Sequence, residues 1–314
     1  MSKKTKKIDW SKTIFICLIC TILVLYTLSL ILTLLWGLLT SLKSYIDFEI
    51  YGNLINIPSL KWSETEFLKL GNYTKIFKDF KITSSVDYFV GNTPVGREST
   101  DTIGTMLLNT LVYAGLVAIL RTVVPAVMAY MCAKYRCKMS DFLNALVVIV
   151  MTIPIVGNYP SMISTLRALN LFDTYFGLMI MNFGFGGMYF LVFYAYFSGL
   201  PDTYAEAAEI DGASQFRILT MIIMPLAIKI MSTVFMILFV QRWNDYRTAL
   251  IYMPTHPTLA YGVYYLSIGT NKGTFAFVPA KTASCMMLAI PILALFIAFK
   301  DKIMGNVTIG GIKG

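Results

Sequence analysis

Long runs of apolar residues, separated by shorter polar segments, dominate the pattern of this chain. The first run, residues 13–39, contains no charged residue and exceeds the roughly 20 residues that a helix needs to cross about 30 Å of hydrocarbon. Five further runs cover residues 106–133, 142–166, 175–200, 227–252 and 279–299. A helix satisfies its backbone hydrogen bonds internally. The pattern therefore predicts an all-α polytopic membrane protein with six transmembrane helices.

Composition supports this prediction. Of the 314 residues, 57% are hydrophobic and only 14% are charged, and the mean hydropathy is +0.67. Soluble domains carry about 25% charged residues, so a large soluble protein is disfavoured. The net charge of +9 does not require a nucleic-acid partner, because Lys and Arg collect on the cytoplasmic side of membrane proteins.

The distribution of basic residues predicts the orientation. They are frequent in the tail of residues 1–12, in the loop after the second run and in the tail of residues 301–314. Both termini are therefore expected in the cytoplasm. Residues 13–39 form the first transmembrane helix, residues 40–104 an extracytoplasmic segment, and residues 105–300 the core transmembrane domain. The long outer segment could brace a binding protein or a partner subunit, or have no such role.

A moderately polar segment, residues 201–226, lies between the fourth and fifth runs on the expected cytoplasmic side. Pro201 suits a helix start, and Asp202 or Thr203 can cap it. Acidic residues follow in the first turns, where the helix dipole favours negative charge. Gly212 supplies a tight turn. The residues alone leave two interpretations: a surface helix with ordinary N-terminal acids, or a docking element for a cytoplasmic partner.

The spacing within this segment resembles a known signature. Glu206-Ala207-Ala208, followed by Gly212, Ile222 and Pro225, is similar to the EAA motif of ABC-importer permeases, with Met224 where that family usually has Leu. "SLKS", "GNYTKIF", "RWNDYRTALIYM" and the terminal "GGIKG" resemble the carbohydrate-uptake, maltose-permease-like branch. The resemblance covers about residues 33–314.

This resemblance implies a type I ABC-importer permease fold in a bacterial cell membrane. The EAA loop would be a coupling helix seated in a groove of an ATP-hydrolysing subunit, through Glu206, Ala207, Ala208, Glu209, Gly212 and Pro225. The C-terminal tail, with Gly311 and Lys313, would run along the ATPase pair, or else be a flexible end. The implied partners are a homologous second permease, two copies of an ATP-binding subunit, an extracytoplasmic solute-binding protein and a carbohydrate substrate.

The chain itself offers little material for catalysis. "GTNKGTF" lacks the Gly-Lys pair of a phosphate-binding loop, and His256 is the only histidine. The five cysteines have no metal-ligand spacing. We therefore expect a transport subunit that is not an enzyme, with no metal and no cofactor of its own. ATP and Mg would be bound by the partner subunits.

Charged residues at membrane depth are costly and usually face a cavity or a partner. Arg121 interrupts the second run, where it could line the pathway, snorkel to the interface, or pair within a permease dimer. The cluster "QRWNDYR" interrupts the fifth run. Its charges could neutralise one another, and its Trp-Asn pair matches the family. The candidate residues for the pathway or gate are Arg121, Gln241, Arg242, Trp243, Asn244 and Asp245.

Two alternatives stay open. An ion-gradient-driven secondary transporter would show matched broken helices and membrane acids, but Asp245 is the only acid clearly within span depth. An ABC permease for a non-sugar solute would share the EAA motif. The leading hypothesis is half of the pathway of an ATP-driven, binding-protein-dependent importer of an oligosaccharide.

Overall fold

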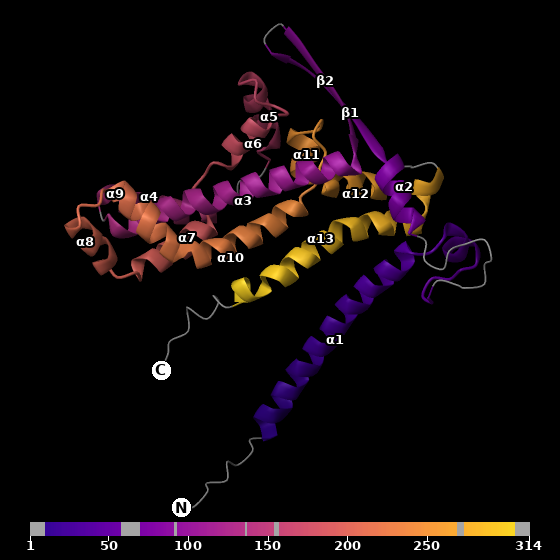
Figure 1. Ribbon diagram of the computed structural model, residues 1–314, viewed down its shortest axis with the longest axis horizontal. Helices are drawn as coiled ribbons and strands as arrows, with labels where there is room; N and C mark the ends of the chain where they lie inside the picture. The colour runs from indigo at the N-terminus through magenta and orange to yellow at the C-terminus, as the bar shows by residue number, and fades with distance from the viewer. Residues whose placement is uncertain are drawn as a thin grey trace, which may run out of the picture. The chain divides into compact units, whose positions relative to one another are not determined.

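The computed structural model describes residues 10–57, 70–90, 93–135, 137–153, 157–268 and 273–304. These residues form mainly helices, with one pair of strands (Figure 1). The chain divides into two compact units. Unit 1 comprises Met1–Ile76 and Gly269–Met287, and unit 2 comprises Phe77–Ile268 and Leu288–Gly314. Gly311 and Lys313, for which the resemblance implies a contact with the ATPase pair, lie outside the described residues.

Unit 1 contains the first apolar helix and the polar segment that follows it. Helix α1 (Trp10–Ser41) is exposed over most of its length, as expected for a helix that faces lipid. A π-helical turn, η1 (Ile46–Ile50), follows it. The Lys43 ammonium is buried and donates to the Asn53 carbonyl at 2.7 Å. Burial lowers the Lys43 pKa, and the nearby Asp47 carboxylate opposes that effect.

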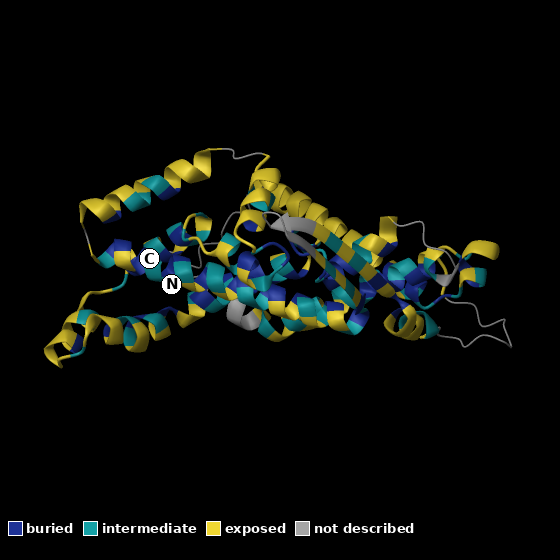
Figure 2. Ribbon diagram, turned by 90° about the horizontal axis from the view of Figure 1, so that it is seen from above, coloured by how far each residue is buried: buried dark blue, intermediate teal, exposed yellow. Residues whose placement is uncertain are grey.

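Helix α3 (Ile103–Lys134) is the longest element of unit 2 and packs against two other helices, α10 (Met224–Trp243) and α7 (Met188–Ser198) (Figure 1). Small buried residues such as Ala114, Ala118 and Ala126 face these contacts on α3, which lets the helix backbones approach closely. Buried and exposed residues are interspersed along the helices of unit 2 (Figure 2). Exposed apolar side chains are expected where helices meet lipid or further subunits.

Among the described residues, four helices are long and apolar enough to cross a membrane: Ser11–Ser41, Ile103–Lys134, Gln215–Trp243 and Val278–Lys300. These correspond to the first, second, fifth and sixth predicted runs. The last belongs to α13 (Val278–Met304), which contributes residues to both units. The expectation of six continuous transmembrane helices is thus not confirmed as stated.

The third and fourth predicted runs are each divided between two shorter helices. Residues 142–166 fall on α4 (Lys138–Thr152) and α5 (Tyr159–Ala168), and residues 175–200 on α6 (Tyr175–Asn182) and α7. Gly157 before α5 and Gly187 before α7 have φ of 79° and 120°, which L-residues with side chains rarely adopt. Hydropathy does not register these breaks, because the flanking residues remain apolar.

The expected fifth helix also ends early. Residues 227–252 are divided between α10 and α11 (Arg247–Tyr252), with Asn244–Tyr246 between them. Helix α12 (Leu259–Ile268) follows and packs against α3. Asp245 accepts hydrogen bonds from the backbone N–H groups of Arg247 and Thr248 at 3.0 and 3.2 Å. This side chain therefore caps the start of α11 and fixes the interruption.

The outer segment of residues 40–104 is not structured by helices alone. After α2 (Gly71–Asp79), two strands pair antiparallel, β1 (Lys81–Val90) and β2 (Thr93–Thr102), in register from Lys81↔Thr102 to Val90↔Thr93. The prediction of an all-α protein overlooks this hairpin. The sequence holds the signal for it, since β-branched residues flank the dipeptide Gly91-Asn92.

A polar junction joins the hairpin to two loops of unit 2. The Asp173 side chain is fully buried and accepts hydrogen bonds from the Thr255 hydroxyl and from the Thr255 amide, the latter at 3.1 Å. Arg97 on β2 donates to the Asp173 carbonyl at 2.8 Å. Nδ1 of His256 lies 3.5 Å from the Asp173 carboxylate. The loops after α5 and after α11 therefore meet the hairpin at one end of the unit.

Asp173 sets a pH-dependent part of the stability of this junction. Burial alone raises the pKa of its carboxyl, but interactions with His256 and Thr255 outweigh burial and hold the pKa below its ordinary value. The ionised form is therefore the one that the folded protein prefers. Its stabilisation is present above the ordinary carboxyl pKa and is lost as the pH falls through the lowered native pKa.

We expect Asp173→Asn to lose about 1–3 kcal/mol, because hydrogen bonds to a buried charged group are replaced by weaker ones. Asn tolerates the positive φ of 58° at this position. The measurement is the apparent melting temperature of the purified protein in detergent between about pH 7 and about pH 2. The variant melts lower at pH 7 and at pH 5, and the gap narrows only below about pH 4, as the pH falls through the lowered native pKa of Asp173. Asp87→Asn, at an exposed site on β1, is the control and leaves the curve unchanged. A gap that does not depend on pH would contradict the assignment.

Candidate functional site

The polar segment of residues 201–226 folds as a short helix, a turn and a second helix. Helix α8 (Thr203–Ile210) carries Glu206, Ala207, Ala208 and Glu209, and α9 (Gln215–Ile218) follows the turn. A π-helical turn, η2 (Leu219–Ile223), then leads into α10, with Pro225 in its first turn. The short helix closed by a turn is the arrangement expected from the sequence.

The start of α8 differs from the expectation in one respect. Asp202 stands at the cap position, but its side chain makes no capping hydrogen bond. Its carboxylate instead pairs with Lys134 at the end of α3, with Nζ 2.6 Å from Oδ1. Lys134 also donates to the carbonyl oxygen of Leu200. Of the two predicted caps, Asp202 or Thr203, Asp202 stands at the cap position but does not cap the helix through its side chain, and its carboxylate pairs with a lysine from another helix.

Gly212 has the role expected from the sequence. Its φ is 78°, in the left-handed region that Gly adopts readily at the end of a helix. Its amide donates to the Glu209 carbonyl at 3.0 Å, and the next amide, of Ala213, donates to the Ala208 carbonyl at 2.9 Å. No other atom lies within 4 Å of where a Cβ would stand. The glycine is therefore required by backbone conformation and not by crowding.

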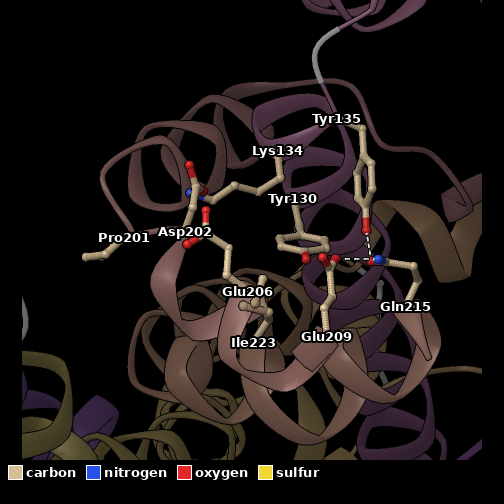
Figure 3. A pocket seen from close by; sticks show the side chains of 10 residues that line it. Tyr130, Lys134, Tyr135, Pro201, Asp202, Glu206, Glu209, Gln215 and Ile223 are labelled. Carbon is tan, nitrogen blue, oxygen red and sulfur yellow. Dashed lines mark hydrogen bonds and ion pairs between the residues drawn. The ribbon is translucent and has the colours of Figure 1, made fainter. Parts of the chain in front are cut away.

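A hydrogen-bonded chain closes the inner side of the turn (Figure 3). Gln215 donates to Glu209 at 2.6 Å, and the hydroxyl of Tyr135, just after α3, bonds to the Gln215 amide oxygen. These groups line a cavity of about 160 Å³ together with Tyr130, Lys134, Asp202 and Glu206. The sequence analysis did not single out Tyr135 or Gln215. Only their position in the fold, across from α8, brings them together.

The same segment also exposes acidic and apolar groups. Glu206, which borders the cavity, is exposed, as are Ile210 (87%), Phe216 (75%) and Tyr204 (47%). Ala208 is buried and turns the opposite face of α8 inward. We call Tyr204, Glu206, Ile210 and Phe216 the loop surface. Large apolar side chains this exposed beside a carboxylate are typical of an interaction site.

A second polar site lies where α10 is interrupted. Asp245 accepts a hydrogen bond from the Tyr113 hydroxyl of α3 at 2.7 Å and from the Thr248 hydroxyl at 2.6 Å. Arg242 forms an ion pair with the same carboxylate at 3.1 Å. The expected mutual neutralisation thus involves Arg242 and Asp245. The guanidinium of Arg247 instead lies beside the ring of Tyr246.

The other candidate pathway residues have different surroundings. Trp243 is 1% exposed and its indole N–H donates to the Leu288 carbonyl at 3.0 Å, so its ring packs inside the protein. The Asn244 side chain is exposed and donates back to Val240 of its own helix, and Gln241 is exposed. Arg121 lies on α3 and is half-buried. A role of these residues in a pathway or gate stays a prediction.

Metal chemistry finds no support in the part of the chain that the structure describes. Within it, no three His, Cys, Asp or Glu side chains gather closely enough to hold a metal ion.

Lys134, which pairs with Asp202, lies in the basic loop that the sequence analysis used only to predict the orientation. A basic residue at the end of one apolar run, facing an acidic loop after another, was the available signal.

Both sites lie in a part of the chain that matches a known protein family. Residues 122–303 match the family described as binding-protein-dependent transport system inner membrane component. This match spans more than half of the chain and includes the loop surface and the α10 interruption, while Arg121 lies one residue before it.

Individual relatives agree with this match. The chain is 26% identical over 66% of its length to a sulfoquinovosyl glycerol transport system permease of Agrobacterium fabrum, covering 73% of that protein. It is 25% identical over 68% of its length to a melibiose/raffinose/stachyose import permease of Bacillus subtilis, covering 77% of that protein.

A solved bacterial ABC transporter for import of the acidic polysaccharide alginate contains a chain of similar fold. The TM-score is 0.72 at 19% identity, covering 95% of this chain and 99% of that one. This structural match confirms the expected type I ABC-importer permease fold.

The role of Gly212 can be tested by its backbone conformation. An L-residue with a Cβ costs about 1–2 kcal/mol in the left-handed region, and Asn costs less. We expect Gly212→Ala to speed hydrogen exchange at the amides of residues 212 and 213 by about 5- to 30-fold, with Gly212→Asn closer to wild type. Gly115→Ala, which has open space on α3, is the control. Equal exchange in the Ala and Asn variants would show that the positive φ does not matter.

Proposed function

Because the chain belongs to the family of binding-protein-dependent transport system inner membrane components, we propose that it forms half of the pathway of an ATP-driven carbohydrate importer. Its companions are a homologous second permease, two copies of an ATP-binding subunit and an extracytoplasmic solute-binding protein. The chain spans a bacterial cell membrane several times and has both termini in the cytoplasm. Membership of this family sets aside a secondary transporter driven by an ion gradient.

The observation that carries this proposal is the loop surface on α8 and α9. Glu206, Ile210 and Phe216 are all exposed on this short segment, so the segment offers both a charge and apolar contact. A partner with a basic groove that has an apolar floor would complement it. The ATP-binding subunits are the partners that supply energy in such importers. The loop surface is therefore assigned to them.

Motion of the loop can reach the membrane helices through direct contacts. Lys134 holds Asp202 and the carbonyl of Leu200, and the hydroxyl of Tyr135 holds Gln215. Both residues come from the end of α3, the helix that packs against α7 and α10. A displacement of α8 by an ATP-binding subunit is thus passed to α3 at two points. This supports alternating access driven by the partner subunits.

ATP and Mg are assigned to the partner subunits. The sequence lacks a phosphate-binding loop with the Gly-Lys pair, and this family consists of transport components. The C-terminal residues Gly311 and Lys313 are assigned to contacts with the same subunits. The chain lines and gates the pathway and passes on the motion of the ATP-binding subunits. ATP hydrolysis takes place in those subunits.

The carbohydrate assignment has support from relatives as well as from resemblance. One relative is named for sulfoquinovosyl glycerol and another for melibiose, raffinose and stachyose. The structural relative imports an acidic polysaccharide. Carbohydrate is what these names share, while charge and chain length differ among them. We therefore propose an oligosaccharide, and the names alone do not define whether it is neutral or acidic.

The proposal is tested by purifying the chain from its own membranes in mild detergent, with mass spectrometry of the proteins that accompany it. We expect a second permease and an ATP-binding subunit with the wild type. Glu206→Lys reverses the charge of the loop surface, and Gly212→Pro forbids the φ of 78°. Both variants should lose at least about 90% of the ATP-binding subunit, equivalent to about 1.4 kcal/mol of binding free energy, and keep the second permease.

Glu98→Lys is the matched control, because Glu98 is an exposed glutamate on β2. It should retain the ATP-binding subunit in full. Carbohydrate-stimulated ATP hydrolysis by the reconstituted complex then tests the substrate class. Copurification of the wild type with no ATP-binding subunit, together with uptake driven by an ion gradient, would refute the assignment.

A further inference from the structure

Two arginines and one carboxylate lie on or just after the packed helices α3 and α10 of unit 2. Arg242 is paired with Asp245, and Arg121 lies near the middle of α3. The helices that surround them, α3, α7 and α10, contain no acidic residue in their sequences. None of the ion pairs among the described residues involves Arg121. The cluster of Arg121, Arg242 and Asp245 therefore carries one uncompensated positive charge.

Asp245 has little capacity left to compensate that charge. Its two oxygens accept hydrogen bonds from Tyr113, from Arg242, from the Thr248 hydroxyl and from the backbone amides of residues 247 and 248. A carboxylate offers about four lone-pair positions, so these five donors saturate it. Asp245 is occupied with capping α11 and with holding α3.

Arg242 also has donor capacity to spare. Its Nη1 is bonded to Asp245, while its Nε is buried and has no hydrogen-bond partner within the described residues. A buried donor without a partner is costly, and an arginine fork that is half used can accept an anion at its free side. The nearby hydroxyl groups of Tyr113 and Thr248 both donate to Asp245. The spare donor capacity of the cluster therefore lies on its arginines.

The position of Arg121 argues against lipid headgroups as the anion. Arg121 is about 27 Å along α3 from its first residue and about 20 Å from its last, at 1.5 Å per residue. A helix end reaches the headgroups, whereas the middle of a helix this long lies in the hydrocarbon region. An arginine there faces a cavity or a partner. In half of a transport pathway, the cavity is the route of the solute.

We propose that Arg121 and Arg242 form a positively charged wall of the pathway, and that the transported carbohydrate bears an acidic group such as a carboxylate, sulfate or phosphate. This inference rests on the proposed function, since it assigns the charge to the solute of that pathway. The anion would replace the missing counter-charge as it passes the α10 interruption. A neutral sugar would leave both guanidinium groups without one.

The first experiment identifies the solute. Cells that express the complete transporter are incubated with a mixture of oligosaccharides from starch, pectin and alginate hydrolysates, beside cells with the Glu206→Lys chain. Species removed from the medium only by the wild type are separated by anion exchange at neutral pH. We expect the removed carbohydrate to be retained on the column. Removal of a neutral carbohydrate overturns the charge inference and leaves the proposed function standing.

One other outcome is distinct. If no removal depends on Glu206, the proposed function is overturned and, with it, this inference.

The second experiment tests the residues, with the identified oligosaccharide and the same molecule after carboxyl reduction or enzymatic removal of its acidic group. Uptake is measured in proteoliposomes that contain the whole complex and its binding protein. We expect Arg121→Gln to raise the KM for the acidic form about tenfold or more. Arg121→Lys, which keeps the positive charge, should have a KM close to that of the wild type. Arg167→Gln removes an exposed cation on α5 and should change nothing.

Two results would overturn the assignment to the solute. One is an unchanged preference for the acidic form in Arg121→Gln. The other is loss of the second permease on purification of Arg121→Gln, since this would show that an acid of that subunit pairs with the arginine.

Discussion

The ion pair between Lys134 and Asp202 joins the longest helix of unit 2 to the loop that carries the signature motif. It adds a direct tie from α8 to α3, beside the Tyr135–Gln215 hydrogen bond and the path of the chain through α9 and η2 into α10. Lys134 also binds the Leu200 carbonyl, which fixes both the backbone and a side chain at the entry to α8. Surface pairs contribute little to stability, and the value of this one is mechanical connection at a defined point.

The sequence analysis predicted the long spans and the loop, because both depend on local pattern. Hydropathy alone identifies residues 106–133 as a spanning helix, and the segment from Glu206 to Gly212 was predicted as a short helix closed by a turn. The breaks at Gly157 and Gly187 escaped prediction, since apolar residues continue on either side and only the backbone changes direction. The hairpin of β1 and β2 was overlooked for another reason. It lies in a segment of mixed polarity that was expected only to be an extracytoplasmic segment, and no strands were predicted there.

The contacts within the candidate sites are where local pattern fails. Tyr135 and Gln215 are 80 residues apart, and Tyr113 and Asp245 are 132 apart. No periodicity relates such pairs, because they are created by the packing of α3 against the segments that begin and end the fifth span. The sequence did indicate that Arg242 and Asp245 could neutralise each other, since residues three apart lie on one face of a helix. It gave no sign that Tyr113 and the start of α11 compete for the same carboxylate.

The same competition explains how the interruption of α10 can serve a pathway. An interrupted helix exposes backbone amides that must find partners in the hydrocarbon region, and Asp245 supplies them for α11. Because Asp245 is used to cap α11, no acid of the cluster is left to compensate the positive charge of Arg121. A charge at membrane depth costs at least about 2.5–3.5 kcal/mol on insertion scales. A structural role alone would favour an apolar residue at this position, whereas transient pairing with an acidic solute gives the cost a function. In this cluster, Asp245 therefore stabilises the structure, and the arginines are left to bind an acidic solute.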